Sequence, residues 1–262
     1  MTLPHITKQQ QAILILIYHY RFLNRIQIQA FLSHKNKKTI NTWLPDLVEK
    51  EYLKRIYSKS FLEKTKPAIY YLGANGIRFI KTLGVTNLTE LRKRYREDSR
   101  TTSFIQQQVL LAQIAITFCA KNATSKTLHT PYSSTEFAES DSPYYFLTEL
   151  NPKLVLVKEK KEGLTVFLLE LFPPALPRYS IRKRIRTYFE YLESGEWESY
   201  MDCPLPITLF VCPDKKTMIY TKRYVKKIKS DEIFPDELVF WFTTEEDVRV
   251  RGISEKIWEV VD

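Results

Sequence analysis

Glycine, cysteine and histidine are scarce in this 262-residue chain, and each scarcity excludes a class of site. None of the six glycines has the GxGxxG or Walker spacing of a phosphate-binding loop. The three cysteines form no CxxC pair, which argues against structural zinc and favours reduced thiols. His129 is the only histidine after residue 34, so no Ser-His-Asp or Cys-His constellation is evident. Metal-dependent phosphodiester chemistry is the enzymatic class that stays open.

Long apolar runs are also missing. The nearest, "AILILIY", is far shorter than the ~20 residues that cross a bilayer. The first residues, "MTLPHITKQQQ", lack the pattern of a signal peptide. Hydrophobic residues nevertheless make up 44% of the chain, enough to form folded cores. We therefore expect a cytoplasmic protein with no membrane partner.

Positive charge is concentrated in the first part of the chain. The formal net charge is +10, and residues 1–100 hold 19 Lys or Arg against 7 Asp or Glu. The remaining residues, 101–262, hold 21 against 23. A basic segment that is also rich in apolar residues favours a folded module that binds a polyanion, because a solvated tail would lack the core. The alternative is a lysine-rich surface with no binding role.

The order of expected elements in this segment is typical of a winged helix-turn-helix. Thr7 precedes a first apolar helix, Asn24 precedes a second, and a third follows from Lys37. "EYLKRIYSK" and "AIYYLG" then read as two strands of a basic hairpin. We assign residues 1–85 to a DNA-binding domain of this kind. The alternative for this module is a winged helix that contacts protein.

Exposed residues of the third helix and the hairpin are the first DNA-binding candidates. The N-terminal end of such a helix reaches base edges in the major groove. Asn can pair with adenine and Thr can contact a thymine methyl, whereas lysines mostly contact phosphate. The candidates are Lys35, Lys37, Lys38, Asn41 and Thr42 on and before the helix, and Lys59, Lys64 and Lys66 on the hairpin.

The rest of the chain predicts a charged helical connector at 86–102 and an α/β domain at 103–262. "YYFLTEL", "KLVLVKE", "LTVFLLELF", "PITLFVC" and "ELVFWFTT" read as strands, with helices at "SIRKRIRTYFEYLESG" and "TMIYTKRYVKKIKS". Strands interspersed with helices favour a mixed sheet. The basic face of "SIRKRIR" adds a second group of DNA-binding candidates: Arg182, Lys183, Arg184 and Arg186.

The winged helix, the long helix from Ser103 and "NPKLVLV…LTVFLLELF…RIRTYFEYL" together resemble the replication-relaxation family of plasmids and conjugative elements. The resemblance implies a second domain similar to the PD-(D/E)xK nuclease fold. In that fold an Asp and a Glu on neighbouring strands bind a divalent metal, and a nearby lysine positions water. Mg²⁺ would be the expected ion, because it prefers oxygen ligands.

Mapped onto this sequence, the resemblance implies a degenerate nuclease site. Glu170 fits the acidic position of the third strand, but Lys153 stands where the family has the first Asp. Phe172 stands where lysine is expected. Lys153 beside Glu170 would form a salt bridge more readily than a metal site.

Two further positions bear on that site. Arg184 and Tyr188 take the places of a helical lysine and tyrosine of the family, and arginine cannot accept a proton. Glu149 is kept as an alternative second carboxylate.

We therefore expect a double-stranded DNA-binding protein of a mobile element, acting in replication, DNA relaxation or transfer, without enzymatic activity or a bound cofactor. One alternative is a metal-dependent nicking enzyme that uses Glu170 as its catalytic residue with Mg²⁺. Another is a winged-helix transcriptional regulator. A homodimer and contacts with replication or transfer proteins are left open as further partners.

Overall fold

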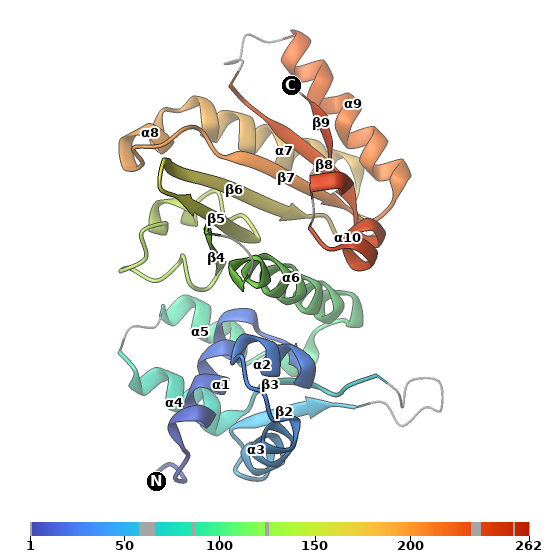
Figure 1. Ribbon diagram of the computed structural model, residues 1–262. Helices are drawn as coiled ribbons and strands as arrows, with labels where there is room; N and C mark the ends of the chain where they lie inside the picture. Colours follow the sequence, from blue (N-terminus) through green and yellow to red (C-terminus); the bar gives the residue numbers. More distant parts are fainter. Residues whose placement is uncertain are drawn as a thin grey trace. The chain divides into compact units, whose positions relative to one another are not determined.

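The computed structural model describes residues 2–57, 66–84, 87–123, 126–231, 237–253 and 255–261 (Figure 1). The chain divides into two compact units. Unit 1 comprises Met1–Ile116 with Ala138–Tyr145, and unit 2 comprises Thr117–Phe137 with Phe146–Asp262. Both combine helices with β-structure, so the chain is a mixed α and β protein.

Unit 1 begins with three helices, α1 (Lys8–Tyr20), α2 (Arg25–Phe31) and α3 (Lys37–Glu49). Thr7 and Asn24 cap the first two, each within a capping box completed by a glutamine three residues later. The two caps expected from the sequence are therefore confirmed. A hydrogen bond of 2.5 Å from the Gln10 side chain to Asp46 links α1 to α3.

A three-stranded sheet follows, with β1 (Leu23–Asn24), β2 (Leu53–Ile56) and β3 (Ile69–Leu72) in the order β1-β3-β2. All its pairs are antiparallel. Gly73 then begins the turn into α4 (Ala74–Thr82), where a Cβ would lie 2.4 Å from the Glu51 carbonyl oxygen. Only glycine fits so close to another backbone. α5 (Leu88–Arg94) and a 3-10 turn, η1 (Glu97–Ser99), complete this part.

The long helix α6 (Thr102–Ala120) contributes residues to both units, whereas the sequence predicted a division before it. Among the described residues it is the one helix whose length and composition would allow it to cross a membrane. The sequence analysis, which searched for uninterrupted apolar runs, did not identify α6 as such a helix, because glutamines interrupt its apolar sequence. Core helices of globular proteins pass the same test, so this finding is weak evidence for a membrane span.

Unit 2 is built on a six-stranded mixed sheet in the order β4-β5-β6-β7-β8-β9. β6, β7 and β8 are parallel, and the other neighbours are antiparallel. The mixed sheet expected from the sequence is confirmed. The strands are β4 (Leu128–Ser133), β5 (Leu154–Lys160), β6 (Gly163–Leu171), β7 (Ile207–Cys212), β8 (Phe240–Thr244) and β9 (Glu259–Val261).

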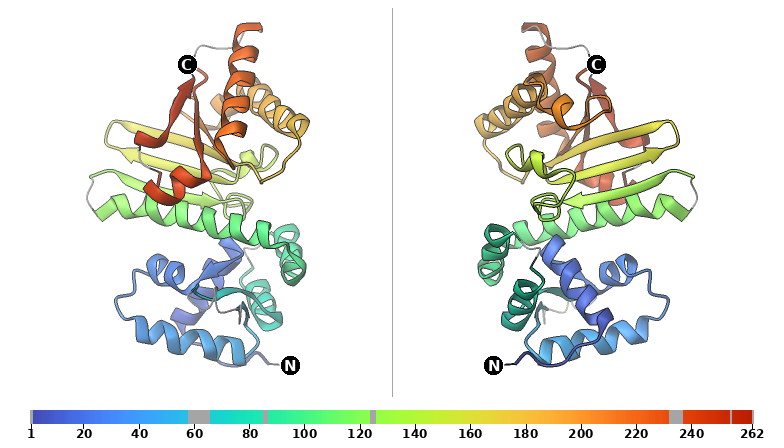
Figure 2. Two further views of the ribbon diagram at one scale, coloured as in Figure 1. Left: turned by 90° about the vertical axis from the view of Figure 1, so that its right-hand side faces the viewer. Right: turned by 90° about the vertical axis from the view of Figure 1, so that its left-hand side faces the viewer.

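Two crossover helices, α7 (Arg178–Glu193) and α9 (Lys215–Asp231), connect the parallel strands and pack side by side (Figure 2). α8 (Glu196–Tyr200) and α10 (Glu245–Arg251) are shorter. Two 3-10 turns, η2 (Lys121–Ala123) and η4 (Glu255–Ile257), complete the unit. The predicted strand "YYFLTEL" is wrong: the structure has a 3-10 turn there, η3 (Tyr145–Thr148).

Candidate functional site

The first half of α3 presents polar and basic side chains to solvent. Asn36 caps the helix by accepting a hydrogen bond of 2.8 Å from the Lys38 amide. The apolar positions Ile40 and Leu44 are buried, which leaves the intervening side chains outside the core. The DNA-binding candidates predicted for this segment are all exposed: Lys35, Lys37, Lys38, Asn41 and Thr42.

The hairpin of β2 and β3 carries the other candidates of unit 1. Lys66 is exposed just before β3. Lys59 and Lys64 lie outside the described residues. The structure therefore places one of the three predicted lysines at the base of the hairpin.

Glu170 forms the centre of an ion cluster in unit 2. It lies near the end of β6 and its residue is only 3% exposed. From α7, Arg184 Nε donates to its Oε2 at 2.7 Å, and the Tyr188 hydroxyl donates to the same oxygen at 3.1 Å. Lys153 Nζ lies 3.8 Å from Oε1. One buried carboxylate thus faces two cations, and the salt bridge expected between Lys153 and Glu170 is present.

Arg184 is held by further contacts. Its Nη1 donates to the Leu150 carbonyl at 2.6 Å and its Nη2 to the Asn151 carbonyl at 2.8 Å. Burial lowers the pKa of Arg184, but the charges and hydrogen bonds of Tyr188 and Glu170 outweigh it, so the net shift is upward. The pKa of Tyr188 is raised well above its ordinary value, first by burial and then by the charge of Glu170. Tyr188 therefore keeps the proton that it donates.

This donor set does not fit a divalent metal ion. Mg²⁺ needs oxygen ligands arranged at about 2.0–2.1 Å. Here both oxygens of Glu170 face cationic or hydroxyl donors. Within the described ranges no group of three or more His, Cys, Asp or Glu could hold a metal. Glu149, the alternative carboxylate, is exposed.

Phe172, which the resemblance placed where a nuclease-like domain would have a lysine, belongs to the core of unit 2. Its side chain is 1% exposed and stacks on Phe210 with ring centroids 5.4 Å apart. Phe210 in turn contacts the Tyr188 ring edge-on. Aromatic packing thus surrounds Phe172.

The basic residues of α7 separate into two groups. Arg184 belongs to the ion cluster with Glu170, whereas Arg182, Lys183 and Arg186 are exposed. Arg182 Nε donates to the Tyr220 hydroxyl at 2.5 Å, and Arg186 Nε to the Tyr224 hydroxyl at 3.1 Å. These tyrosines of α9 were missed by the sequence analysis. The spacing of four residues between them was the available signal.

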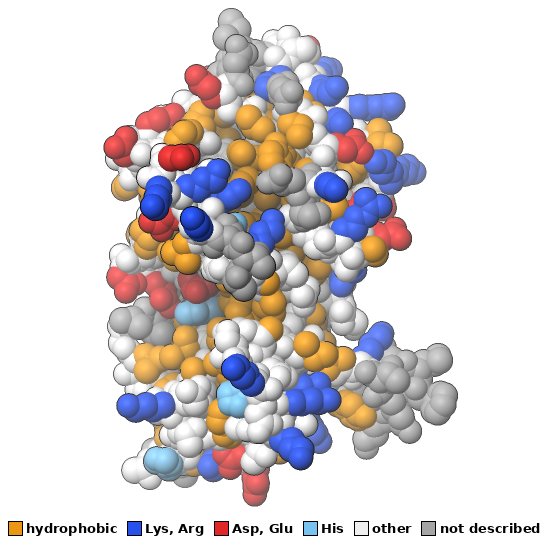
Figure 3. All heavy atoms as spheres, viewed as in Figure 1, with side chains coloured by type: hydrophobic (Ala, Val, Ile, Leu, Met, Phe, Trp, Pro, Cys, Tyr) orange, Lys and Arg blue, Asp and Glu red, His pale blue; other side chains and the backbone are white. Residues whose placement is uncertain are grey.

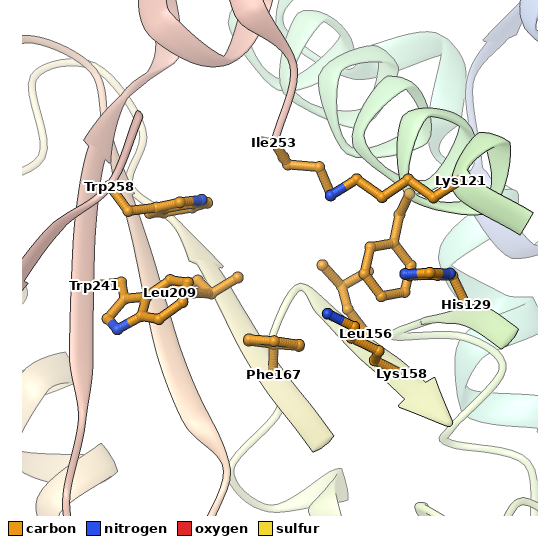
Figure 4. Close-up of a pocket in the computed structure, with 10 residues that line it drawn as sticks. Lys121, His129, Leu156, Lys158, Phe167, Leu209, Trp241, Ile253 and Trp258 are labelled. Atoms are coloured by element: carbon orange, nitrogen blue, oxygen red, sulfur yellow. The ribbon is translucent and has the colours of Figure 1, made fainter. Parts of the chain in front are cut away.

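A small pocket lies on the sheet of unit 2 between residues of five strands and the end of α6 (Figure 4). Trp241 and Trp258 form one wall, with ring centroids 6.3 Å apart. Lys121 and Lys158 lie at its opposite side. Its volume of about 50 Å³ is enough for a few water molecules and too small for a nucleotide.

The sequence matches the replication-relaxation family over residues 14–203. The chain belongs to this family. The match includes α3, the Glu170 cluster and α7, and it ends before β7 and α9. Membership suggests a role in the replication or relaxation of plasmid or other mobile-element DNA.

Other comparisons add little. No curated protein matches the chain. Among solved structures the restriction endonuclease FokI is similar, with 10% sequence identity and a TM-score of 0.28. The alignment covers 95% of this chain and 45% of the FokI chain, so this chain spans less than half of that protein. So low a TM-score carries no argument about fold or activity.

Proposed function

We propose that this replication-relaxation protein is a cytoplasmic double-stranded DNA-binding protein of a mobile element, in which unit 1 is a winged helix-turn-helix. The exposed N-terminal half of α3 is the observation that carries the proposal. Lysines there would contact phosphates, and Asn41 and Thr42 would reach base edges. The charge excess of residues 1–100 supports a polyanion as the partner.

The element order of unit 1 supports the same reading. Three helices precede an antiparallel pair, β2 and β3, as in a winged helix. α3 would be the recognition helix, and the β2–β3 hairpin would follow the phosphate backbone beside the groove. Thr42 donates its hydroxyl to the Lys38 carbonyl at 3.2 Å, so its methyl is the group left for an apolar base contact.

For unit 2 we propose a PD-(D/E)xK-like domain that no longer cleaves DNA. The Glu170 ion cluster supports this, because Lys153 and Arg184 neutralise the carboxylate that would bind metal. Phe172 supports it too, since it packs in the core. Such a domain would serve binding or assembly, with Glu170 as a structural residue.

The salt dependence of duplex binding tests the role of α3. We expect Lys37→Ala with Lys38→Ala to weaken binding to unrelated duplexes about equally and to lower the slope of log K against log [salt] by about 1.8, or 0.9 for each phosphate contact. Fluorescence anisotropy over a salt series measures this. The matched control is Lys8→Ala with Lys81→Ala, which removes two exposed lysines from α1 and α4. An unchanged slope in the α3 variant would contradict the proposal.

Asn41→Ala tests base reading on the same helix. Because a good bidentate base contact discriminates by about 1–3 kcal/mol, the variant should bind all duplexes with more nearly equal affinity. A selected site and its scrambled duplex supply the comparison. Equal weakening on both would assign Asn41 to phosphate contact instead.

A further inference from the structure

α7 and α9 run parallel and meet along matched pairs of side chains. Arg182 pairs with Tyr220 and Arg186 with Tyr224, both 38 positions apart in the chain. Because successive contacts have the same sequence separation, the two helices run in the same direction. This follows from the parallel order of β6, β7 and β8, whose crossover helices return in the same direction.

The arginines of this seam stack on the tyrosine rings. The guanidinium carbon of Arg178 lies 4.7 Å from the Tyr220 centroid. That of Arg182 lies 5.7 Å from Tyr220 and 5.6 Å from Tyr224. Arg178, Arg182 and Arg186 recur every fourth residue, so they form a row with steps of about 6 Å along α7. We call these three arginines and two tyrosines the arginine–tyrosine ladder.

The ladder lies in a strongly basic setting. α9 carries seven Lys or Arg and one Asp. Figure 3 shows Lys and Arg side chains gathered over α9. Lys215 and Lys222 pair with Glu259. Arg178 and Arg182, by contrast, are exposed and have no carboxylate partner among the described residues. Glu190, one further step along α7, ends the basic row.

A hollow of about 250 Å³ opens at the first step of the ladder. Arg178, Lys216 and Tyr220 line it together with Asp214, Pro173 and Pro213. Two cations and one carboxylate thus border a cavity that is large enough for a phosphate group and its sugar. The row of arginines continues from this hollow along the surface of α7.

We propose that the arginine–tyrosine ladder binds the phosphate backbone of duplex DNA, as a second contact surface of this protein. Guanidinium groups cover the tyrosine rings, so the surface offers donors for phosphate oxygens and little open ring area for base stacking. The hydroxyls of Tyr220 and Tyr224 accept from Nε, which orders the guanidinium groups before DNA arrives. Contact is therefore independent of sequence. The inference rests on the proposed function and adds a site in unit 2.

The test combines Arg178→Gln and Arg182→Gln in one variant of the full chain. This double variant should lower the salt slope of duplex binding by about 1–2 on every sequence, since each lost phosphate contact removes about 0.9. The matched control, Arg249→Gln with Arg251→Gln, removes two exposed arginines from α10 of the same unit. An unchanged slope in the ladder variant, or an equal drop in the control, would overturn the proposal.

Tyr220→Phe provides a second variant that keeps the ring and every charge. It removes only the acceptor of Arg182 Nε, and we expect a smaller loss of duplex affinity with an unchanged circular dichroism spectrum. Unaltered affinity would overturn the ordering role of the hydroxyl. Binding to single-stranded oligo-dT is measured in parallel. If Tyr220→Phe weakens binding to oligo-dT but not to duplexes, the result would overturn duplex backbone binding in favour of a single-strand site.

Comparison with the α3 variant separates the two proposals. If the salt dependence of duplex binding falls in the α3 variant alone, the result would support the proposed winged helix and contradict DNA binding by the ladder. Loss in the ladder variant alone would support the ladder and contradict the role of α3. Independent losses in both would support two surfaces, and no loss in either would overturn both.

Discussion

Glu170 shows how neighbouring charges decide the role of one carboxylate. In a nuclease it would be held near another carboxylate and a metal. Here Lys153 and Arg184 supply the compensating charge, and Tyr188 supplies a further hydrogen bond. We therefore interpret Glu170 as a stabilising residue that ties β6 to α7.

Replacement of Glu170 tests this interpretation. Glu170→Gln leaves the half-buried Arg184 without its counter-charge, so the free energy of unfolding should fall by about 2–3 kcal/mol. Urea denaturation measures the change, with Glu162→Gln, in the exposed β5–β6 turn, as the control. A variant as stable as the parent chain would contradict the stabilising role, and a more stable variant would point to a carboxylate held under strain for catalysis.

Phe172 and Lys153 also show what sequence reasoning could supply at this scale. The resemblance implied both departures from the nuclease pattern, and the salt bridge between Lys153 and Glu170 was predicted from the sequence. The hydrogen bonds from Arg184 to the Leu150 and Asn151 carbonyls were not, because they depend on how the chain turns before β5. No local pattern encodes that turn.

The helices and strands that the sequence predicted correctly are those marked by a strong local pattern. Thr7 and Asn24 cap helices through their own side chains, and the apolar runs of β5 and β6 are long. β4 was missed because Pro131 lies within it. A proline is tolerated there because β4 lies at the edge of the described sheet, where it pairs with β5.

The predicted charged connector shows a second limit. One of its charged residues, Arg94 at the end of α5, is only 2% exposed. Its Nη2 donates to the Tyr18 carbonyl at 2.8 Å, and its Nη1 lies 3.7 Å from Glu97. Glu97 also accepts two hydrogen bonds from Arg21, at 2.7 and 3.0 Å. The carboxylate thus joins the end of α1 to α5 and η1.

This junction predicts a large effect from a small change. Glu97→Gln should lower the free energy of unfolding by about 3 kcal/mol, because Arg94 stays buried and loses the carboxylate of its ion pair. Burial already lowers the pKa of Arg94 to about 10, with repulsion from Arg21 as the next cause. The neighbouring Asp98→Asn, whose pair with Lys54 is exposed, should change stability by less than about 0.5 kcal/mol. Similar melting temperatures for both variants would contradict a stabilising role of Glu97 between α1, α5 and η1.

At the scale of the whole molecule, net charge is an incomplete guide to where a polyanion binds. Residues 101–262 are close to neutral, so the sequence directed attention to the first hundred residues. Folding concentrates positive charge in that second part, because the packing of α7 against α9 brings the basic residues of the two helices together. The sequence named Arg182 and Arg186 as candidates, but only the packing of the two crossover helices reveals their tyrosine partners on α9.

The central claim is that this protein binds duplex DNA and does not cleave it. Incubation of supercoiled plasmid with the purified full chain, in Mg²⁺, in Mn²⁺ and in EDTA, tests both parts in one gel. We predict a retarded band in all three conditions, with the plasmid still supercoiled after the protein is removed. Metal-dependent conversion to open circles, absent from Glu170→Gln at a temperature where that variant is folded, would contradict the claim and make Glu170 catalytic.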